Sequence, residues 1–583
     1  MRRDPHSYAD DEQAAVEHLS WDVDVDFESR TLQCSADLRL RGASDLVDLD
    51  TRDLTIEAVD DGKSALGWEL AEAQPILGAR LRVHANGATR VRIRYRTSPT
   101  ASALQWLTPA QTAGGVQPFL FSQCQAIHAR SLVPLQDTPR VRITYDARIT
   151  APTMLRSLMA AADKGIEGSI GHWEMPQPIP PYLIAFAVGD LESREVGPRS
   201  RVWAEPSVVD AAAWEFAGVD DMLTTAERLF GAYDWERFDI LTMPPSFPYG
   251  GMENPRLTFL TPTLLAGDRS LVSVVAHELA HSWTGNLVSN ASAEHFWLNE
   301  GFTVFAERRI VEALYGVDTC ALQAAIGRRG LDEAFERFGK KPELTRLRTK
   351  LEGIDPDEVF SEIPYEKGYL FLRAIEEAAG REAFDRFLRA YLGEFRFGAI
   401  DSDDFQRLVE RELPGVLEKV DGKAWLDGAG LPAAAPVMRA KKMEAVEAIA
   451  AAGRVATEEE AAEWGATEWE LYLTALPRPF AECEALDARF ELTKKGNYEV
   501  LVAWLTLALA SGHEDVVPRA EEVLAKVGRM KYLRPLYGAM IARGGETRKR
   551  AAALFERVRA TYHPIAQQVV EGLLAAADRS DKT

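Results

Sequence analysis

The stretch VVAHELAHSW, from Val274 to Trp283, places two histidines four positions apart, with a glutamate directly after the first. Residues i and i+4 lie on one face of a helix, so His277 and His281 can both offer a ring nitrogen to a single cation. The flanking residues are apolar and place the pair near a core, which disfavours a solvated helix face with incidental polar side chains. Glu278 then lies beside the cation, where it can accept a proton from water.

A third protein ligand is supplied by the segment WLNEGF, in which Glu300 follows His281 with eighteen residues between them. This gap suits a return on an antiparallel second helix. Two histidines and one glutamate, with the fourth position left to water, form a catalytic zinc site, whereas a structural zinc site is closed. His295 is an alternative ligand, but Glu300 begins an apolar helical run that would hold it rigidly. The sequence therefore predicts one Zn2+ per chain, bound by His277, His281 and Glu300.

Such a site can hydrolyse an amide without a protein nucleophile, because zinc lowers the pKa of its water to about 7 and polarises a bound carbonyl. We expect Glu278 to act as general base for attack of the zinc-bound water and then to carry the proton to the leaving amine. Tyr365, in SEIPYEKGYLF, is the candidate donor to the oxyanion. A tyrosine beside a proline also fits a purely structural role in packing.

Length and composition describe a large, acidic, globular chain. Its 583 residues are 46% hydrophobic and 27% charged, with a formal net charge of −22. Single hydrophobic cores stop growing well below this length, so several domains are expected. The acidic balance argues against nucleic acid as a partner, because phosphate binding needs clustered lysine and arginine. It favours approach by cationic groups such as a peptide amino terminus, although dispersed acidic residues also serve solubility.

The amino-terminal sequence and the cysteines bear on the cellular location. The start MRRDPHSYADDEQAAVEHLS has no apolar segment after its arginines and does not resemble a secretory signal. The apolar run from Leu501 to Ala510 is too short to span a bilayer and predicts a buried helix. The four cysteines lie far apart and form no CxxC pair, which suits reduced thiols. We expect a cytoplasmic monomer without membrane contact.

The pattern along the chain predicts a multidomain α+β protein with domains at residues 1–193, 194–430 and 441–583. From about residue 21 to 196, polar and apolar residues alternate at period two, as in half-buried strands of a β-sheet domain. The periodicity then becomes helical. A linker rich in alanine, proline and glycine lies at 428–437, and amphipathic segments without a clean fixed repeat follow. These predict a solenoid-like helical domain.

Several segments together resemble one protein family. PPSFPYGGMENP at 244–255, HELAHSWTGNLV and HFWLNEGF are similar to the M1 metallo-aminopeptidases. FSQCQAIHARSLVPLQDTPRVRITY, DPDEVFSEIPYEKG and GRMKYLRPLY are similar to its leukotriene A4 hydrolase and aminopeptidase B branch. The resemblance runs from about residue 18 to the last helices. It implies a thermolysin-like catalytic domain and removal of single residues from the free amino ends of short peptides.

The resemblance also implies roles for residues that spacing alone does not assign. Glu253 matches the carboxylate that holds the substrate α-amino group, and a fixed buried anion penalises substrates that lack a free amino terminus. Tyr365 matches the transition-state tyrosine. Asp357 matches an aspartate that favours basic first residues. The complete substrate-binding set implied by the resemblance is Gln125, Ala126, Gly250, Gly251, Met252, Glu253, Asp357, Arg529 and Lys531.

Within that set, Gln125 matches the partner of Glu253, and Gly250 and Gly251 would let the peptide backbone approach closely. Arg529 and Lys531 match a pair that binds the carboxylate of very short peptides. From the residues alone, a basic turn on a helical surface is the preferred interpretation of these two cations, and only the resemblance assigns them a binding role.

Two further functions stay open. The first alternative is hydrolysis of a fatty-acid epoxide at the same metal, as in the leukotriene A4 hydrolases; Asp357 and Glu253, which serve epoxide opening there, are present. Ala293 and Phe360 stand where that branch lines its lipid pocket with other aromatic residues, and Phe302 stands where its members carry a histidine. The second alternative is an inactive peptide-binding scaffold, which the complete set of catalytic groups disfavours.

Overall fold

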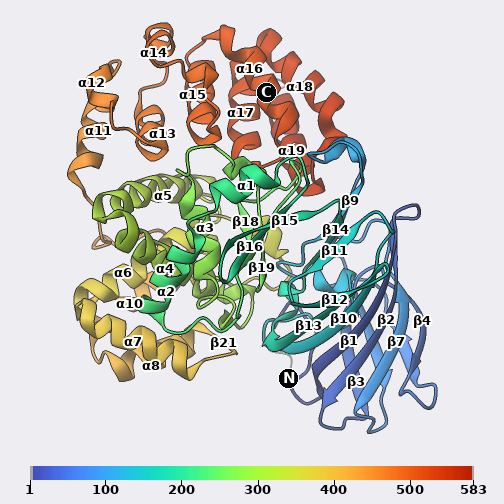
Figure 1. Ribbon diagram of the computed structural model, residues 1–583. Coiled ribbons are helices and arrows are strands. Elements are labelled where there is room, and N and C mark those ends of the chain that lie inside the picture. Colours follow the sequence, from blue (N-terminus) through green and yellow to red (C-terminus); the bar gives the residue numbers. More distant parts are fainter. Residues whose placement is uncertain (1–3, 581–583) are drawn as a thin grey trace.

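The computed structural model describes residues 4–580 and has three parts that follow one another along the chain (Figure 1). Strands dominate the first part, a mixture of helices and strands carries the histidine motif, and helices alone form the last part. The predicted fold class is thus confirmed. Residues 1–3, which begin the first predicted domain, and residues 581–583, which end the last one, lie outside the described residues.

The N-terminal part is built on a seven-stranded sheet whose central strands show the predicted alternation. Every second residue of β2 (Thr31–Arg41) is buried along most of its length, because successive side chains of a strand point to opposite faces. The strand order is β12-β13-β10-β1-β2-β7-β4. The bounds are β12 (Ala162–Glu167), β13 (Ile170–Ile179), β10 (Ile143–Thr150), β1 (Ala15–Asp26), β7 (Arg90–Arg96) and β4 (Thr55–Asp60).

Two smaller sheets complete this part, and one of them leads to the site. The four-stranded sheet β11-β14-β9-β8 contains β9 (Phe119–Ser122). The loop after β9 runs through Gln125 to a 3-10 turn at Ala129–Ser131, so the end of this sheet projects residues 123–128 towards the middle part. The other strands are β11 (Arg156–Met159), β14 (Phe186–Gly189), β8 (Leu104–Leu107), and, in the sheet β3-β6-β5, β3 (Leu46–Thr51), β6 (Ala79–His84) and β5 (Gly67–Leu70).

The middle part begins with a five-stranded sheet in the order β15-β16-β17-β19-β18. The last strand, β18 (Gly251–Met252), pairs antiparallel with β19 (Leu257–Leu260) and forms the edge of the sheet. The motif GGMEN therefore runs along a sheet edge. The remaining strands are β15 (Glu192–Gly197), β16 (Ser200–Ala204) and β17 (Asp239–Thr242), and the helices α1 (Val209–Glu215) and α2 (Val219–Phe230) follow β16.

Two helices carry the predicted metal ligands. Helix α3 (Val272–Ala280) ends at the second histidine of the motif, and α4 (Trp297–Tyr315) begins with WLNEGF and is buried along most of its length. They pack against each other. Helices α5 (Val317–Arg337) and α6 (Gly368–Ala379) also pack on α4. The remaining helices of this part are α7 (Arg381–Glu394), α8 (Ser402–Glu412), α9 (Val416–Lys419) and α10 (Gly422–Asp427).

A contact between two glycines brings the tyrosine segment against α4. A Cβ on Gly301 would come within 2.7 Å of the Cα of Gly368, and a Cβ on Gly368 within 2.8 Å of the Cα of Gly301. Larger residues at either position would force the two backbones apart. The close approach places the π-helical turn η8 (Ile363–Lys367), which contains Tyr365, directly beside the helix that contains Glu300.

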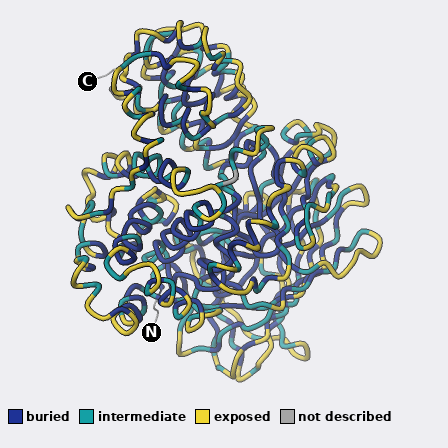
Figure 2. Tube along the Cα trace, turned by 60° about the vertical axis from the view of Figure 1, so that its left-hand side comes forward, coloured by how far each residue is buried: buried dark blue, intermediate teal, exposed yellow. Residues whose placement is uncertain are grey.

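The C-terminal part is an array of helices with its own hydrophobic core. Helix α15 (Tyr498–Ala510), the apolar run of the sequence, is almost completely buried between α13 (Ala466–Ala475) and α17 (Met530–Arg543). Figure 2 shows this part as a separate lobe with exposed residues on its outer turns. The other helices are α11 (Lys441–Ala451), α12 (Glu458–Ala461), α14 (Cys483–Phe490), α16 (Val517–Lys526), α18 (Gly545–Val558) and α19 (Pro564–Ser580). Within residues 4–580, none of the helices combines the length and the apolar character that a membrane crossing requires.

Candidate metal centre and active-site cleft

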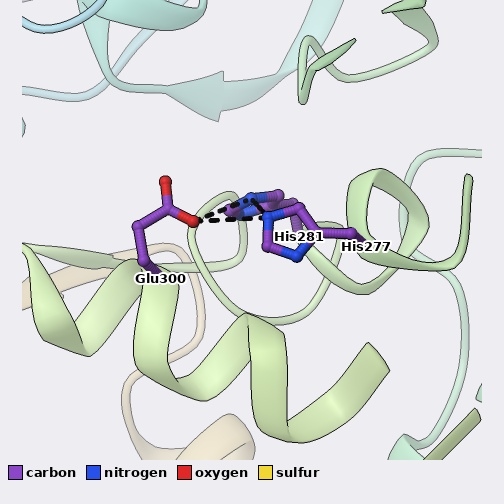
Figure 3. A group of neighbouring side chains, drawn as sticks. All are labelled: His277, His281 and Glu300. Atoms are coloured by element: carbon purple, nitrogen blue, oxygen red, sulfur yellow. Dashed lines mark hydrogen bonds and ion pairs between the residues drawn. The ribbon is translucent and has the colours of Figure 1, made fainter. Parts of the chain in front are cut away.

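The three predicted metal ligands meet at one point between α3 and α4 (Figure 3). The Nε2 atoms of His277 and His281 lie 3.2 Å apart, and each lies 3.4 Å from Oε2 of Glu300. That oxygen is buried and receives no hydrogen bond. A tetrahedral zinc with ligand atoms at about 2.0 to 2.1 Å separates them by about 3.3 to 3.4 Å. The three atoms thus fit one face of a zinc tetrahedron.

Partners behind the histidines fix which nitrogen faces the centre. Nδ1 of His281 lies 3.1 Å from the carbonyl oxygen of Thr284. A carbonyl only accepts, so this nitrogen carries the proton and Nε2 presents its lone pair to the centre. Nδ1 of His277 lies 3.0 Å from a carboxylate oxygen of Glu307. A carboxylate also only accepts, so Nδ1 of His277 carries the proton and its Nε2 faces the centre. The sequence prediction missed Glu307, although it follows Glu300 by seven residues, two turns further along one face of α4.

The electrostatics of the centre favour positive charge. Burial alone would lower the pKa of His277, but the carboxylates of Glu300 and Glu307 outweigh burial and raise it well above its usual value. Burial likewise opposes ionisation of Glu300, yet the two histidines lower the pKa of this carboxyl to about 2. A cavity that stabilises protonated imidazoles so strongly also suits a divalent cation, and the cation would take the place of the protons.

The competing ligand, His295, lies elsewhere. Its Nδ1 is 3.0 Å from the hydroxyl of Ser402 on α8, and burial lowers the pKa of its ring. His295 is not part of the cluster of potential ligand atoms found within residues 4–580.

Glu278 and Tyr365 lie on two sides of the centre. Glu278 is buried, and burial raises the pKa of its carboxyl to about 7. Its carboxylate packs on Gly251, where an added Cβ would come within 2.3 Å of Oε1. The ring of Tyr365 stacks on His277, with centroids 6.1 Å apart and planes at 20°. Burial and the negative charges of Glu300 and Glu362 raise the pKa of Tyr365 well above its usual value, so the phenol remains a hydrogen-bond donor.

A buried carboxylate lines the cleft next to the centre. Glu253 is 4% exposed, and the side-chain amide of Gln125 donates to its Oε1 at 3.1 Å. Potential ligand atoms of Glu253, Glu278 and His281 all lie within 4.8 Å of one another. The adjoining residue Ala126 also lines the cleft, and the side chain of Met252 is buried in β18.

A cation from the C-terminal part reaches the other end of GGMEN. The backbone N–H groups of Gly528 and Met530 donate to the carbonyls of Pro245 and Pro248 at 2.9 and 3.0 Å, which ties the residue between them to this segment. Arg529 is 6% exposed, and a Cβ on Gly250 would lie 3.0 Å from its Nη2. For Arg529, the alternative of a solvated basic turn is therefore wrong.

Acidic residues that the sequence did not single out balance Arg529 and Lys531. Lys531 Nζ lies 2.6 Å from Oε2 of Glu499 and 3.5 Å from Oε1 of Glu470. Arg529 Nη1 lies 3.4 Å from Oε1 of Glu499 and donates to the hydroxyl of Tyr532 at 2.9 Å. The two cations and two anions form a neutral network in the cleft wall.

Asp357 lines the same cleft and is tied to the N-terminal part. Its Oδ2 lies 2.8 Å from Nε2 of His128, whose Nδ1 lies 2.8 Å from the hydroxyl of Ser102. The sequence prediction did not include His128, although it belongs to the segment QAIH after Gln125. Residues of all three parts of the molecule thus line one large cleft that contains the metal centre.

The three departures from the resemblance occupy different places. Ala293 and Phe360 line the cleft, and Phe360 is 42% exposed. Phe302 is buried in α4 and stacks on Tyr391 with centroids 4.4 Å apart. Phe302 therefore belongs to the packing behind the site and does not line the cleft.

Comparison with known proteins assigns the chain to a family. The Peptidase M1 N-terminal domain matches residues 6–183, the Peptidase family M1 domain residues 214–423 and the C-terminal domain of leukotriene A4 hydrolase residues 464–574. Leukotriene A-4 hydrolase of Xenopus laevis is 38% identical over 97% of this chain and 98% of that protein. Leucine aminopeptidase 2 of Aspergillus niger is 36% identical over 98% of this chain and 97% of that protein.

A solved structure agrees with these matches over the whole fold. Yeast LTA4 hydrolase in complex with bestatin superimposes with a TM-score of 0.93 at 34% identity, covering 98% of this chain and 97% of that one. The resemblance inferred from the motifs is confirmed. The chain belongs to the M1 peptidase family and carries the C-terminal domain of the leukotriene A4 hydrolases.

Proposed function

We propose that this protein is a zinc-dependent aminopeptidase that removes the first residue from short peptides. The observation that carries the proposal is the position of Glu253. This buried carboxylate lines the cleft within 4.8 Å of potential ligand atoms of Glu278 and His281. A substrate bound at the centre therefore lies beside a buried anion, and the part of the substrate next to it must carry a group that compensates this charge. A free α-ammonium does so.

Zinc fits the donor set, and His277, His281 and Glu300 would hold it. When bound, it acts as a Lewis acid towards the scissile carbonyl and makes nearby water more acidic. Glu307 keeps the ring of His277 in the tautomer that ligation needs, because its carboxylate accepts from Nδ1.

The residues of the chain supply the proton transfers and the charge stabilisation. Glu278 accepts a proton from the attacking water at its carboxylate and delivers it to the departing amine, for which a pKa near neutrality is well matched. Tyr365 donates its phenolic proton in a hydrogen bond to the oxygen that becomes negative in the transition state. Burial around both residues excludes bulk water and strengthens these interactions.

The far end of the cleft supports a preference for short substrates. Gly251 packs on Glu278 and Gly250 packs on Arg529. Neighbouring residues of a strand are about 3.3 Å apart. A peptide that follows this strand from the catalytic base reaches Arg529 and Lys531 within one or two residues, where its carboxylate can form charge-assisted hydrogen bonds.

A panel of amino-acid 4-nitroanilides tests the proposal. Substrates with free and acetylated amino groups are compared before and after chelation and after addition of zinc. We expect hydrolysis only of the free amines, loss of activity with chelator and recovery with zinc. Cleavage of the acetylated substrates at comparable rates would contradict the role of Glu253 and indicate an endopeptidase.

A second candidate is hydrolysis of a fatty-acid epoxide, and the position of Asp357 favours it. Its carboxylate is 38% exposed, lines the same cleft and is oriented by His128. An anion at that place can direct water to the carbocation left by an opened allylic epoxide. Product analysis by mass spectrometry, with Asp357→Asn as comparison, tests this candidate. If Asp357→Asn gives the same ratio of enzymatic to spontaneous diol products as the parent, the proposed role of Asp357 is excluded.

We also propose a cytoplasmic location. All four cysteines, Cys34, Cys124, Cys320 and Cys483, are buried and free of disulfides. This is typical of proteins that function in a reducing compartment. Fractionation of the native cells with an antibody tests this part of the proposal.

A further inference from the structure

Two glycines in the middle of α5 make room for two glutamates. A Cβ on Gly327 would come within 2.1 Å of Oε1 of Glu366, and a Cβ on Gly330 would lie 3.3 Å from Cγ of Glu362. Glycine is unfavourable inside a helix relative to alanine, but at these two positions any larger residue would meet a glutamate side chain. The close packing of α5 on the tyrosine segment fixes both glutamates along one side of η8.

The two glutamates differ in what they contact. Glu366 is buried and accepts from Nη2 of Arg308 at 2.6 Å. Glu362, one turn earlier, lines the cleft and its side chain is exposed to it. Among residues 4–580, no hydrogen-bond donor or cation pairs with its carboxylate. Arg308 thus supplies a cationic partner for Glu366, whereas the carboxylate of Glu362 faces the cleft without an ion-pair partner.

The surroundings of Glu362 connect it to the metal ligands and to the C-terminal part. Its side chain reaches the cleft, but desolvation by neighbouring residues and repulsion by Glu366 raise the pKa of its carboxyl to about 7. Tyr365, three residues later, stacks on the metal ligand His277, and Lys531 lines the same cleft as Glu362. His277 and Lys531 both act electrostatically on Glu362, which agrees with a position near both groups.

The second residue of a bound peptide can reach this stretch of the cleft. With the scissile carbonyl at the metal centre and the carboxylate of a short peptide at Arg529, the residue after the scissile bond would span the space between them. Its backbone would follow Gly250 and Gly251, and its side chain could then contact η8 or the turn before it, which contains Glu362 and lines the same cleft.

We propose that Glu362 determines specificity for the second residue of the peptide and favours lysine or arginine there. The proposal rests on the proposed aminopeptidase function. A cationic side chain supplies the counterion that Glu362 lacks, whereas an acidic side chain would face repulsion in a partly desolvated wall. A neighbouring cation also stabilises the charged form of Glu362, so pairing and ionisation reinforce each other.

The tripeptides Ala-Lys-Ala, Ala-Leu-Ala and Ala-Glu-Ala test the proposal in the full-length zinc enzyme. The ratio of kcat/KM for the lysine and leucine peptides cancels any general damage to the enzyme. Glu362→Gln removes the charge, and Glu358→Gln is the matched control, because Glu358 is an exposed acid that lines the same cleft four residues earlier. Glu362→Lys reverses the charge and tests for a gained preference.

We expect the lysine-to-leucine ratio to fall about tenfold in Glu362→Gln and to stay within twofold in Glu358→Gln. In Glu362→Lys, Ala-Glu-Ala should become a better substrate than Ala-Lys-Ala. An unchanged ratio in Glu362→Gln, with all three peptides still cleaved, would overturn the role of Glu362 alone. If the parent enzyme cleaves none of the peptides, the aminopeptidase function and this inference both fail.

Discussion

Replacing Gly251 by alanine tests whether the position of Glu278 controls the reaction. The added Cβ would lie 2.3 Å from Oε1 of Glu278 and 2.6 Å from its Cγ. Ordinary contacts begin near 3.4 Å, so the carboxylate must retreat by about 1 Å. A misplacement of 1 Å costs about 100-fold in rate, which corresponds to about 2.7 kcal/mol of transition-state stabilisation.

The assay compares kcat and KM on alanine 4-nitroanilide for the parent, Gly251→Ala and the control Gly250→Ala. A Cβ on Gly250 meets only the flexible end of Arg529 at 3.0 Å and a methyl of Val274 at 3.7 Å. We expect kcat to fall about 100-fold in Gly251→Ala and less than tenfold in Gly250→Ala. Zinc content should match the parent in both variants, because neither glycine contacts a ligand.

A kcat of Gly251→Ala within threefold of the parent would refute the reasoning, since the base would then tolerate the displacement. A rise in KM with unchanged kcat would also refute it, because that pattern indicates an obstructed substrate and an undisturbed base.

Three further predictions concern the centre. Glu278→Gln should lower kcat at least 100-fold while zinc stays near one per chain by atomic absorption, because the base is not a ligand; loss of zinc would assign it a different role. Tyr365→Phe should lower kcat by 100-fold or more with little change in KM; a change confined to KM would contradict a transition-state contact. Glu307→Gln should weaken zinc binding by 10- to 100-fold in chelator competition, whereas Glu312→Gln, which breaks a surface pair with Arg381, should not; equal affinities in both variants would remove Glu307 from the support of the metal.

The parts of the site that the sequence predicted are those that depend on local spacing. Helical periodicity brings His277 and His281 to one face, and the gap to Glu300 suits a helix that returns beside the first. The triad therefore appears where the motif predicted it. The alternating strands and the apolar run at α15 were predictable for the same reason, because each depends on a short repeating pattern.

Partners that come from distant segments could not be predicted in this way. Arg529 is buried because Gly528 packs on Ser246, where an added Cβ would come within 2.9 Å of the backbone. Nothing in GRMKYLRPLY indicates that contact. His128 and Asp357 pair across two domains, and the spacing of residues along the chain carries no information about such a meeting. Glu307 is different. Its spacing from Glu300 matches the helical period of α4 and places both on one face, but the same spacing fits a glutamate on a solvent-exposed helix face equally well.

The edge position of β18 has a consequence for the shape of the substrate. One side of this strand pairs with β19 and Gly251 at its start lines the cleft, so under the proposed function a peptide would lie against it as an additional strand. Only an unfolded, extended amino end can do this, which protects folded proteins from the enzyme. Proline after the first residue offers no N–H to the strand, so peptides that begin X-Pro should persist when other peptides are degraded.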